Sequence, residues 1–220
     1  YQDEQAPCGN CMEIFADSQA LPEDAASAKI GVRFHRSDAT ESSDSIQALG
    51  RSRALGSTRI SLLSDDYRSV RGITAQLPMD GGGEQSQRES YDPVGAYAFS
   101  NAAAAAWYAR LQAQSHEVHG RTWLGQGTVR GFQSGTWLQV LQAPFSAAPE
   151  LLLTEVEHAG INNLPTDVRH AMNDALGKAP IGTADAALWQ QAEKVGYANR
   201  FKATEHAMPW RPALVDGTGQ

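Results

Sequence analysis

The two cysteines of the chain, Cys8 and Cys11, have the C-x-x-C spacing found in redox and metal-binding sites. The pair Gly9-Asn10 between them is typical of a two-residue hairpin turn, which would place the cysteines opposite each other and within reach of a disulfide. A thioredoxin-type thiolate lies at a helix N-terminus, whereas the residues after Cys11 alternate as a strand does. A plain hairpin is therefore predicted, with a labile disulfide and a metal site as open alternatives.

A metal centre needs further ligands, and His116 and His119 in "SHEVHG" are the candidates. Their spacing is i and i+3, whereas the zinc-binding helix of a metalloprotease places its histidines at i and i+4. The motif "GFQSG" joins two predicted strands, so a tight turn explains it better than a nucleophile elbow. No catalytic, cofactor or metal site is predicted, and a zinc-dependent hydrolase that uses the histidines and cysteines is the alternative from another functional class.

The composition limits the partners of the chain. With 220 residues, a formal charge of -7 and a pI near 5.3, it is an acidic chain for which nucleic acid and anionic membranes are poor partners. No apolar segment reaches membrane-spanning length, no signal peptide is recognisable, and two cysteines cannot build a disulfide scaffold. The first residue is not Met and the last residues are rich in Pro and Gly, so a fragment of a longer protein is expected.

Short strands dominate the predicted elements. Strands are expected at residues 30–35, 45–54, 58–63, 70–77, 122–130, 136–142, 151–158 and 197–204, and helices from Asn101 to a stop at Gly120, at 166–176 and at 184–194. Five consecutive alanines follow Asn101, whose side chain suits a helix N-cap. The fold class expected is mainly β with a few helices (α+β), a small antiparallel β-barrel or sandwich plus a strand-rich subdomain.

Three parts are expected along the chain. The flexible composition of "PMDGGGEQSQRES" suggests a boundary near residue 90. Residues 1–90 would form a strand-rich subdomain and residues 91–165 a barrel-like subdomain with one helix. Residues 166–220 would hold a helical segment, the last strand and an exit linker to a further domain.

Several segments, in order, resemble the VgrG family of type VI secretion spike proteins, in the part related to the baseplate hub of contractile phages. They are "TESSDSI" with the two strands that follow it, "YDPVGAYAFSNAAAAAWYARL", "GQGTVRGFQSGTWLQV", "LLLTEVEHAGINNLP" and "GYANRFKATEHAMPWRP". The resemblance covers roughly residues 30–212, and the shared order of the segments is what makes it specific.

The resemblance implies a structural protein rather than an enzyme, with a fold of the phage baseplate-hub type. In such proteins three copies form a tube whose paired barrels match the hexameric rings of the Hcp tube, while a tip protein and effectors attach beyond the C-terminal side of the hub. It also implies assembly in the bacterial cytoplasm and injection by the type VI apparatus. A phage tail baseplate hub is the alternative of the same class.

Large aromatic and cationic side chains are the candidate interface residues. The candidate aromatic anchors are Trp107, Trp123, Trp137 and Trp210, with packing inside one subunit as the competing interpretation. The candidates for ion pairs between subunits are Arg33, Arg36, Arg130 and Arg200. Exposed pairs contribute about 0–1 kcal/mol, so they would set register more than affinity. The chain on its own is expected to be mostly monomeric.

Overall fold

The computed structural model describes residues 2–3, 11–12, 14–35, 43–79, 88–145, 149–161, 164–176 and 186–213. The chain divides into two compact units. The barrel unit combines Tyr1–Ala16, Ala20–Gly50 and Trp123–His206, and the helical unit combines Asp17–Gln19, Arg51–Thr122 and Ala207–Gln220. Each unit is therefore assembled from segments that are distant in sequence.

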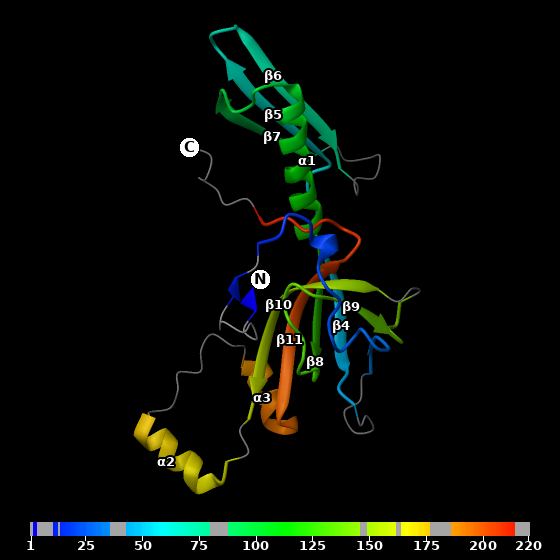
Figure 1. The fold of residues 1–220 in the computed structure, drawn as a ribbon, viewed down its shortest axis with the longest axis vertical. Helices are drawn as coiled ribbons and strands as arrows, with labels where there is room; N and C mark the ends of the chain where they lie inside the picture. The colour runs from blue at the N-terminus through cyan, green and yellow to red at the C-terminus, as the bar shows by residue number, and fades with distance from the viewer. Residues whose placement is uncertain are drawn as a thin grey trace. The chain divides into compact units, whose positions relative to one another are not determined.

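A six-stranded sheet forms the barrel unit (Figure 1). In sheet order its strands are β3 (Val32–Arg33), β9 (Trp137–Leu141), β10 (Glu150–Gly160), β11 (Tyr197–Glu205), β8 (Arg121–Gly127) and β4 (Ile46–Arg53). The two ends of the sheet meet, because Phe34, next to β3, forms a bridge with Ile46 of β4 and the amide of His35 donates to the Ile46 carbonyl at 2.8 Å. The sheet thus curls into a partly closed barrel, which confirms the predicted fold class.

Large apolar side chains fill the inside of this barrel. Its buried core consists of Val32, Phe34, Ile46, Trp123, Val129, Phe132, Leu138, Val140, Leu151, Leu153, Phe201 and Ala203. The rings of Phe132 and Phe201 meet edge to face with centroids 5.4 Å apart, a favoured aromatic arrangement. Strands that alternate apolar and polar residues supply this core from one face and leave the other face to solvent.

A loop of the barrel unit, residues 22–31, is fixed to β9 by backbone and side-chain hydrogen bonds. The amide of Asp24 donates to the Trp137 carbonyl at 2.7 Å, and the amide of Trp137 donates to the Pro22 carbonyl at 3.0 Å. The carboxylate of Asp24 accepts from the Ala26 amide and from the Thr136 hydroxyl. Asp24 is only 2% exposed, so this loop contributes a buried acid to the barrel unit.

The helices of the barrel unit are α2 (Thr166–Leu176) and α3 (Ala186–Val195). Leu188 and Ala192 of α3 are buried against Ala159 of β10 and Ala198 of β11. Small residues on both sides allow the helix to lie close to the two strands. A short ladder of β1 (Gln2–Asp3) and β2 (Cys11–Met12) also belongs to this unit.

The helical unit is a three-stranded sheet with one long helix on a face (Figure 1). Its central strand β5 (Arg59–Asp66) pairs antiparallel with β6 (Arg71–Pro78) and parallel with β7 (Glu89–Ala96). The helix α1 (Ala102–His119) begins where the Asn101 side chain accepts from the Ala104 amide at 2.9 Å, and Gly120 is its C-cap. Both predicted ends of this helix are confirmed.

Alanines bring α1 close to the sheet. Ala105, Ala109 and Ala113, spaced by one helical turn, are buried against Ile60 and Leu62 of β5. A methyl side chain fills little space between two backbones, so the branched residues of β5 occupy most of it. Residues 17–19, which include the start of η1 (Ser18–Ala20), and residues 207–213 also belong to this unit. The Ser115 hydroxyl of α1 donates to the Pro212 carbonyl at 2.8 Å.

Two sequence expectations need correction, and a third concerns residues that the structure does not describe. Asp3 of β1 pairs with Cys11 of β2. The predicted turn at Gly9-Asn10 and its other flank, Cys8, lie outside the described residues. The strand expected at residues 30–35 is shorter in the structure, where it consists of β3 and the bridge at Phe34. Strand β7 was not predicted, because Pro93 and Gly95 disfavour an interior strand; both are tolerated in an edge strand such as β7.

The predicted boundaries at residues 90 and 165 do not coincide with the division into units. The first predicted boundary, at residue 90, falls inside β7, and β7 pairs with β5, which lies before that boundary. Strands β10 and β11 pair from Leu151↔Glu205 to Gly160↔Tyr197 across the second boundary. Composition suggested the boundary near residue 90, but strand pairing crosses both predicted boundaries.

Candidate functional site

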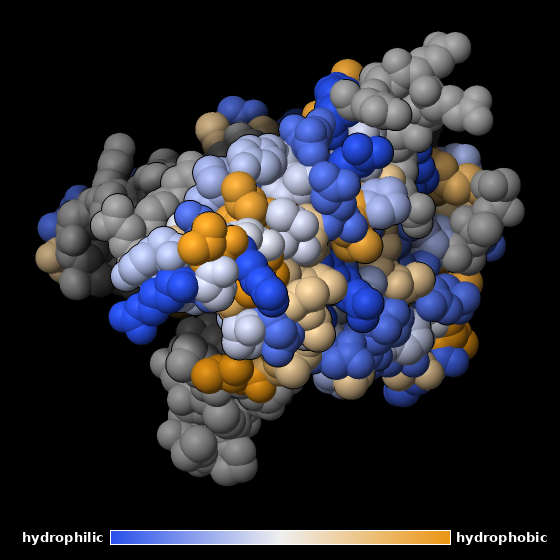
Figure 2. All heavy atoms as spheres, turned by 90° about the horizontal axis from the view of Figure 1, so that it is seen from above, coloured by the Kyte–Doolittle hydropathy of each residue, from blue (hydrophilic) through white to orange (hydrophobic). Residues whose placement is uncertain are grey.

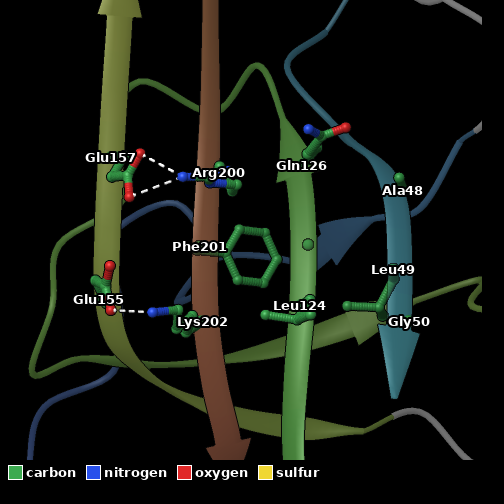
Figure 3. Close-up of a pocket in the computed structure, with 11 residues that line it drawn as sticks. Ala48, Leu49, Gly50, Leu124, Gln126, Glu155, Glu157, Arg200, Phe201 and Lys202 are labelled. Carbon is green, nitrogen blue, oxygen red and sulfur yellow. Dashed lines mark hydrogen bonds and ion pairs between the residues drawn. The ribbon is translucent and has the colours of Figure 1, made fainter. Parts of the chain in front are cut away.

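A groove lies on the outer face of the barrel sheet (Figure 3). Its volume is about 610 Å³, and its walls come from β4, β8, β10 and β11. The lining residues are Ala48, Leu49, Gly50, Leu124, Gly125, Gln126, Glu155, Glu157, Arg200, Phe201 and Lys202. Three neighbouring strands, β10, β11 and β8, place these side chains in two rows.

Each row follows the register of the sheet. One row pairs Glu155 with Lys202 and Lys202 with Leu124. The second row pairs Glu157 with Arg200 and Arg200 with Gln126. Because side chains two residues apart share a face, all these residues project into the groove. Each row runs from an acid through a base to an uncharged side chain.

Two ion pairs form one wall of the groove. The Arg200 guanidinium contacts both carboxylate oxygens of Glu157, at 3.0 and 2.8 Å, and Lys202 Nζ lies 2.7 Å from Glu155 Oε2. About half of the Lys202 and Glu155 side chains and 34% of the Arg200 and Glu157 side chains are exposed. Pairs this exposed contribute about 0–1 kcal/mol each, so their main effect is to fix which residues of β10 and β11 face each other.

The floor of the groove depends on one glycine. Phe201 is 1% exposed and pairs in register with Gly125 of β8. A side chain on Gly125 would place its Cβ 2.1 Å from Phe201 Cζ, so the ring fills the space that a larger residue would occupy. Figure 3 shows the ring directed from β11 toward β8, between the two rows. The floor is therefore apolar while the rim carries balanced charge.

The side chains of the groove combine an apolar floor with charged groups that are already paired. Among the described residues that line it there is no Ser, Thr, Cys or His, so these residues offer no hydroxyl, thiol or imidazole. Its two carboxylates are each held by a cation. An apolar floor with a few polar groups at the rim is the composition of protein contact surfaces.

The four predicted aromatic anchors have different surroundings. Trp123 is 4% exposed inside the barrel core, and its ring meets Phe145 edge to face at 5.1 Å. Trp137 is half-buried and stacks on His206, with ring centroids 4.8 Å apart. Trp210 is half-buried in the helical unit, where its amide donates to the Ser18 hydroxyl at 2.8 Å. Trp107 on α1 is 53% exposed, so of the four it presents the most surface to a partner.

The predicted arginines make contacts within the chain. Arg200 pairs with Glu157 in the groove, and Arg130 lies 3.5 Å from Asp44 and over the ring of Tyr197. Arg33 Nε donates to Gln142 at 3.1 Å. Arg36 lies outside the described residues. Pairing between subunits stays a prediction for all four.

The alternative metal site gains no support from the geometry. Within the described ranges, no three His, Cys, Asp or Glu side chains lie close enough together to hold a metal ion. His119 Nδ1 lies 2.7 Å from the Ser115 carbonyl oxygen of its own helix, so this nitrogen is engaged in a local hydrogen bond. Both histidines lie in the last turn of α1, and Cys8, which the alternative site would also use, lies outside the described residues.

The hydrophobic residues that can be seen in Figure 2 are scattered. On the face drawn there they form separate small patches among hydrophilic ones. Isolated exposed apolar residues of this kind need no special explanation. Of the helices in the described part of the chain, none combines the length and apolar character that a membrane-spanning helix needs.

Sequence reasoning identified Arg200 but missed its groove partners. The signal was present in the sequence as two acids, Glu155 and Glu157, and two bases, Arg200 and Lys202. The members of each pair are two residues apart, so they share one face of their strand. Such pairs on two predicted strands indicate one shared face if the strands are neighbours. The sequence alone does not say which strands are neighbours.

Comparison with known proteins identifies the relatives of this chain. The sequence profile of the phage tail baseplate hub (GPD) family matches residues 3–164. No curated protein sequence matches the chain.

Two solved structures share its fold. A tail protein from Neisseria meningitidis MC58 is 11% identical with a TM-score of 0.52, over 86% of this chain and 48% of that one. The 43 kDa tail protein of prophage MuSo2 from Shewanella oneidensis is 11% identical with a TM-score of 0.51, over 86% of this chain and 47% of that one. The chain thus spans about half the length of these tail proteins.

Proposed function

Because the chain belongs to the phage tail baseplate hub family, we propose that it is the hub portion of a type VI secretion spike protein. The coarser statement, a structural protein of the baseplate-hub type, follows from the family and from the barrel fold. The finer assignment to a spike is supported by the ordered motifs between residues 30 and 212 that resemble the VgrG family. The family match over residues 3–164 is the observation that carries the proposal.

In this role the protein acts through assembly and not through a reaction. Three copies of the full-length protein form the hub, which sits on the hexameric Hcp tube and is injected with effectors attached beyond the C-terminal side. The groove supports an assembly role, because its apolar floor and neutralised rim suit contact with protein. The exposed Trp107 is the aromatic candidate for a contact between copies.

Light scattering coupled to size exclusion tests the assembly. We expect a chain extended in both directions to elute as a trimer and the 220-residue chain to be mostly monomeric at low micromolar concentration. In the extended chain, Trp107→Ala should shift the equilibrium toward monomer, with Ala106→Ser on the same exposed stretch of α1 as the matched control. If the extended chain stays monomeric, the proposed trimeric assembly fails.

Binding to purified Hcp rings separates the spike from the alternative of the same class, a phage tail baseplate hub. The names of the two similar structures, both tail proteins, favour keeping that alternative. An extended trimer that binds Hcp rings supports the spike. A trimer that ignores Hcp rings but binds a phage tail-tube protein would replace the spike by the phage hub.

A further inference from the structure

The outer edge of β6 has no partner strand among the described residues of the helical unit. In the sheet order β6-β5-β7 this strand is at one end, so one of its edges faces away from β5. The amide of Met79 donates to the Thr58 carbonyl at 2.9 Å, which continues the ladder as a hydrogen-bonded pair. Hydrogen-bonded and non-hydrogen-bonded pairs alternate in an antiparallel ladder. The residues whose N–H and C=O groups point away from β5 are therefore Gly72, Thr74 and Gln76.

This edge lacks the usual protection against pairing with another chain. Gly72, Thr74 and Gln76 are exposed, whereas the residues between them pack against the core beneath α1. No charged residue and no Pro occurs from Gly72 to Leu77. Charged side chains and Pro are the usual means of keeping an edge strand unpaired. Within the described part of the chain, the β6 edge is thus open to a further strand, which would bind through backbone hydrogen bonds.

The opposite edge of the same sheet is interrupted. The amide of Arg59 in β5 donates to the Arg88 carbonyl at 3.2 Å, at the start of the parallel pairing with β7. Alternation then directs the backbone groups of Glu89, Tyr91 and Pro93 away from β5. Pro93 has no N–H group, so it breaks the row of donors on the outer edge of β7. One edge of the sheet is therefore blocked and the other is open.

A second copy of the chain offers one matching edge among its described residues. The ends of the barrel sheet meet at the bridge between Phe34 and Ile46, and the strands β1 and β2 are two residues long each. Strand β7 is blocked at Pro93, so the remaining edge is β6 itself. The chain has a formal charge of -7, yet this segment carries no charge, so two copies can approach along it without repulsion between the strands.

We propose that β6 pairs antiparallel with β6 of a second copy, about a twofold axis at Thr74. In this register Thr74 faces Thr74 of the second copy and Gly72 faces Gln76, so each copy donates and accepts at all three residues. Thr–Thr pairs across strands are favourable. Arg71 lies opposite Leu77 rather than opposite another charge. The contact joins the two three-stranded sheets into one continuous sheet.

This contact goes beyond the proposed trimer. A contact about a twofold axis is saturated by two copies, so it cannot close a ring of three. It links two free chains or two separate hubs. Because the contact is small, its dissociation constant should be on the order of 0.1–1 mM, which agrees with a mostly monomeric chain at low micromolar concentration.

Sedimentation equilibrium of the 220-residue protein tests the proposal. We expect the mean mass to rise from 23.7 kDa toward twice that value as the concentration increases from low micromolar to about 1 mM. Thr74→Pro removes an outward N–H group but no bond to β5, and it should weaken the dimer by at least about tenfold. Thr74→Val keeps this N–H group and should dimerise as the unchanged protein does. A mass that does not rise, or an equal rise in both variants, would overturn the proposal.

A charge exchange at Thr74 tests the register. Thr74→Lys and Thr74→Glu each place like charges opposite each other in the proposed dimer, so each variant alone should stay mostly monomeric at about 1 mM. An equimolar mixture should recover the dimer, because the lysine of one chain then faces the glutamate of the other. If the mixture stays monomeric, or if each variant dimerises alone, the twofold pairing at Thr74 is wrong.

If Thr74→Pro does not fold, amide hydrogen exchange in the unchanged protein decides the matter. The amides of Gly72, Thr74 and Gln76 should exchange fast in dilute solution and more slowly at about 1 mM. The amides of Ile73 and Ala75, which face β5, should be protected at both concentrations. Fast exchange of the first three amides at both concentrations would overturn the proposal.

The same measurement separates this contact from the trimer. If the outward amides of β6 are protected only in the extended trimer, a neighbouring subunit of the trimer covers the edge, and pairing of β6 with itself is wrong. Dimerisation of the 220-residue chain does not depend on trimer formation, so the spike assignment can fail while the β6 contact stands.

Discussion

The barrel unit and the helical unit fill their interiors in opposite ways. The barrel encloses large side chains, with Phe132 and Phe201 among the largest buried residues. The helical unit places the alanines of α1, such as Ala109, against Ile60 and Leu62 of a three-stranded sheet. A curled sheet surrounds a volume that needs big residues, whereas a helix on a sheet approaches closely only if its contact face is small.

The two units also bury different polar groups. In the described parts of the barrel unit, Asp24 and Asn199 are buried, and the side-chain amide of Asn199 donates to the Val129 carbonyl at 2.6 Å. The described buried polar residues of the helical unit are serines, of which Ser64 donates to the Gly95 carbonyl and accepts from the Ala98 amide. A serine hydroxyl does not titrate, whereas a carboxyl group does, so the buried polar groups of the two units should respond differently to pH.

The largest loss of stability is expected when a large side chain is removed from the barrel core. Phe201→Ala should lower the free energy of unfolding by about 3–5 kcal/mol, because it removes a fully buried ring and leaves a cavity. Urea denaturation measures the loss. Leu124→Ala is the control on the neighbouring strand, since Leu124 is 46% exposed and should cost less than about 1 kcal/mol. Equal losses from both substitutions would refute the assignment of Phe201 to the barrel core.

The contact between Gly125 and Phe201 provides a second test of how tightly the barrel core is packed. Gly125→Ala should destabilise the protein by about 3 kcal/mol, the upper part of the range for overpacking, because the new Cβ meets the ring at 2.1 Å. The penalty should largely disappear in a Phe201→Ala background, where the ring is absent. A double-mutant cycle measures this coupling, and strictly additive effects would show that the two residues do not share this space.

The strands and the helix with clear patterns could be predicted from the sequence. Alternation located β4, β5 and β6 to within a few residues, and the Asn101 cap and the alanines located α1. Strand β7 was missed because it is a parallel edge strand that contains Pro93. Its place beside β5 depends on pairing across the intervening residues and not on local preference.

The groove could be predicted only in part for the same reason. The residues Glu157 and Arg200 were visible as charges on two strands, but 43 positions separate them in sequence. Only the antiparallel pairing of β10 with β11 brings them together. The trimer contacts implied by the family resemblance remain predictions, because no partner subunit tests them.

The close packing of α1 gives a smaller effect than the barrel core. Ala109→Leu should destabilise the protein by about 1–2 kcal/mol, since Ala109 is 1% exposed and a larger side chain must push the helix away from β5. Ala106→Leu on the exposed side of α1 should change the stability by less than about 0.5 kcal/mol. Thermal unfolding measures both. If Ala109→Leu stabilised the protein, there would be unfilled space between α1 and the sheet. The helical unit would then accept large core residues as the barrel unit does.

The smallest effect concerns pH and the buried acid of the barrel unit. Burial raises the pKa of Asp24 above its ordinary value of 3.8, and hydrogen bonds from the Ala26 amide and the Thr136 hydroxyl offset this only in part. The Thr136 hydroxyl has one hydrogen, yet it lies 2.8 Å from the Gln133 carbonyl and 3.1 Å from Asp24 Oδ2. A protonated Asp24 satisfies both contacts, because it can donate to the hydroxyl while the hydroxyl donates to Gln133.

The sign of the effect follows from the raised pKa. Between 3.8 and the pKa in the folded state, the folded protein binds more protons at Asp24 than the unfolded chain does, so the stabilising contribution declines as the pH rises through this window. Asp24→Asn carries no titrating group and can make the same hydrogen bonds, so its stability should decline less over that interval. Urea denaturation at several pH values measures the difference, and Asp17→Asn, which removes an exposed carboxylate, is the control. If the two variants have the same pH dependence, the buried acid does not distinguish the barrel unit from the helical unit.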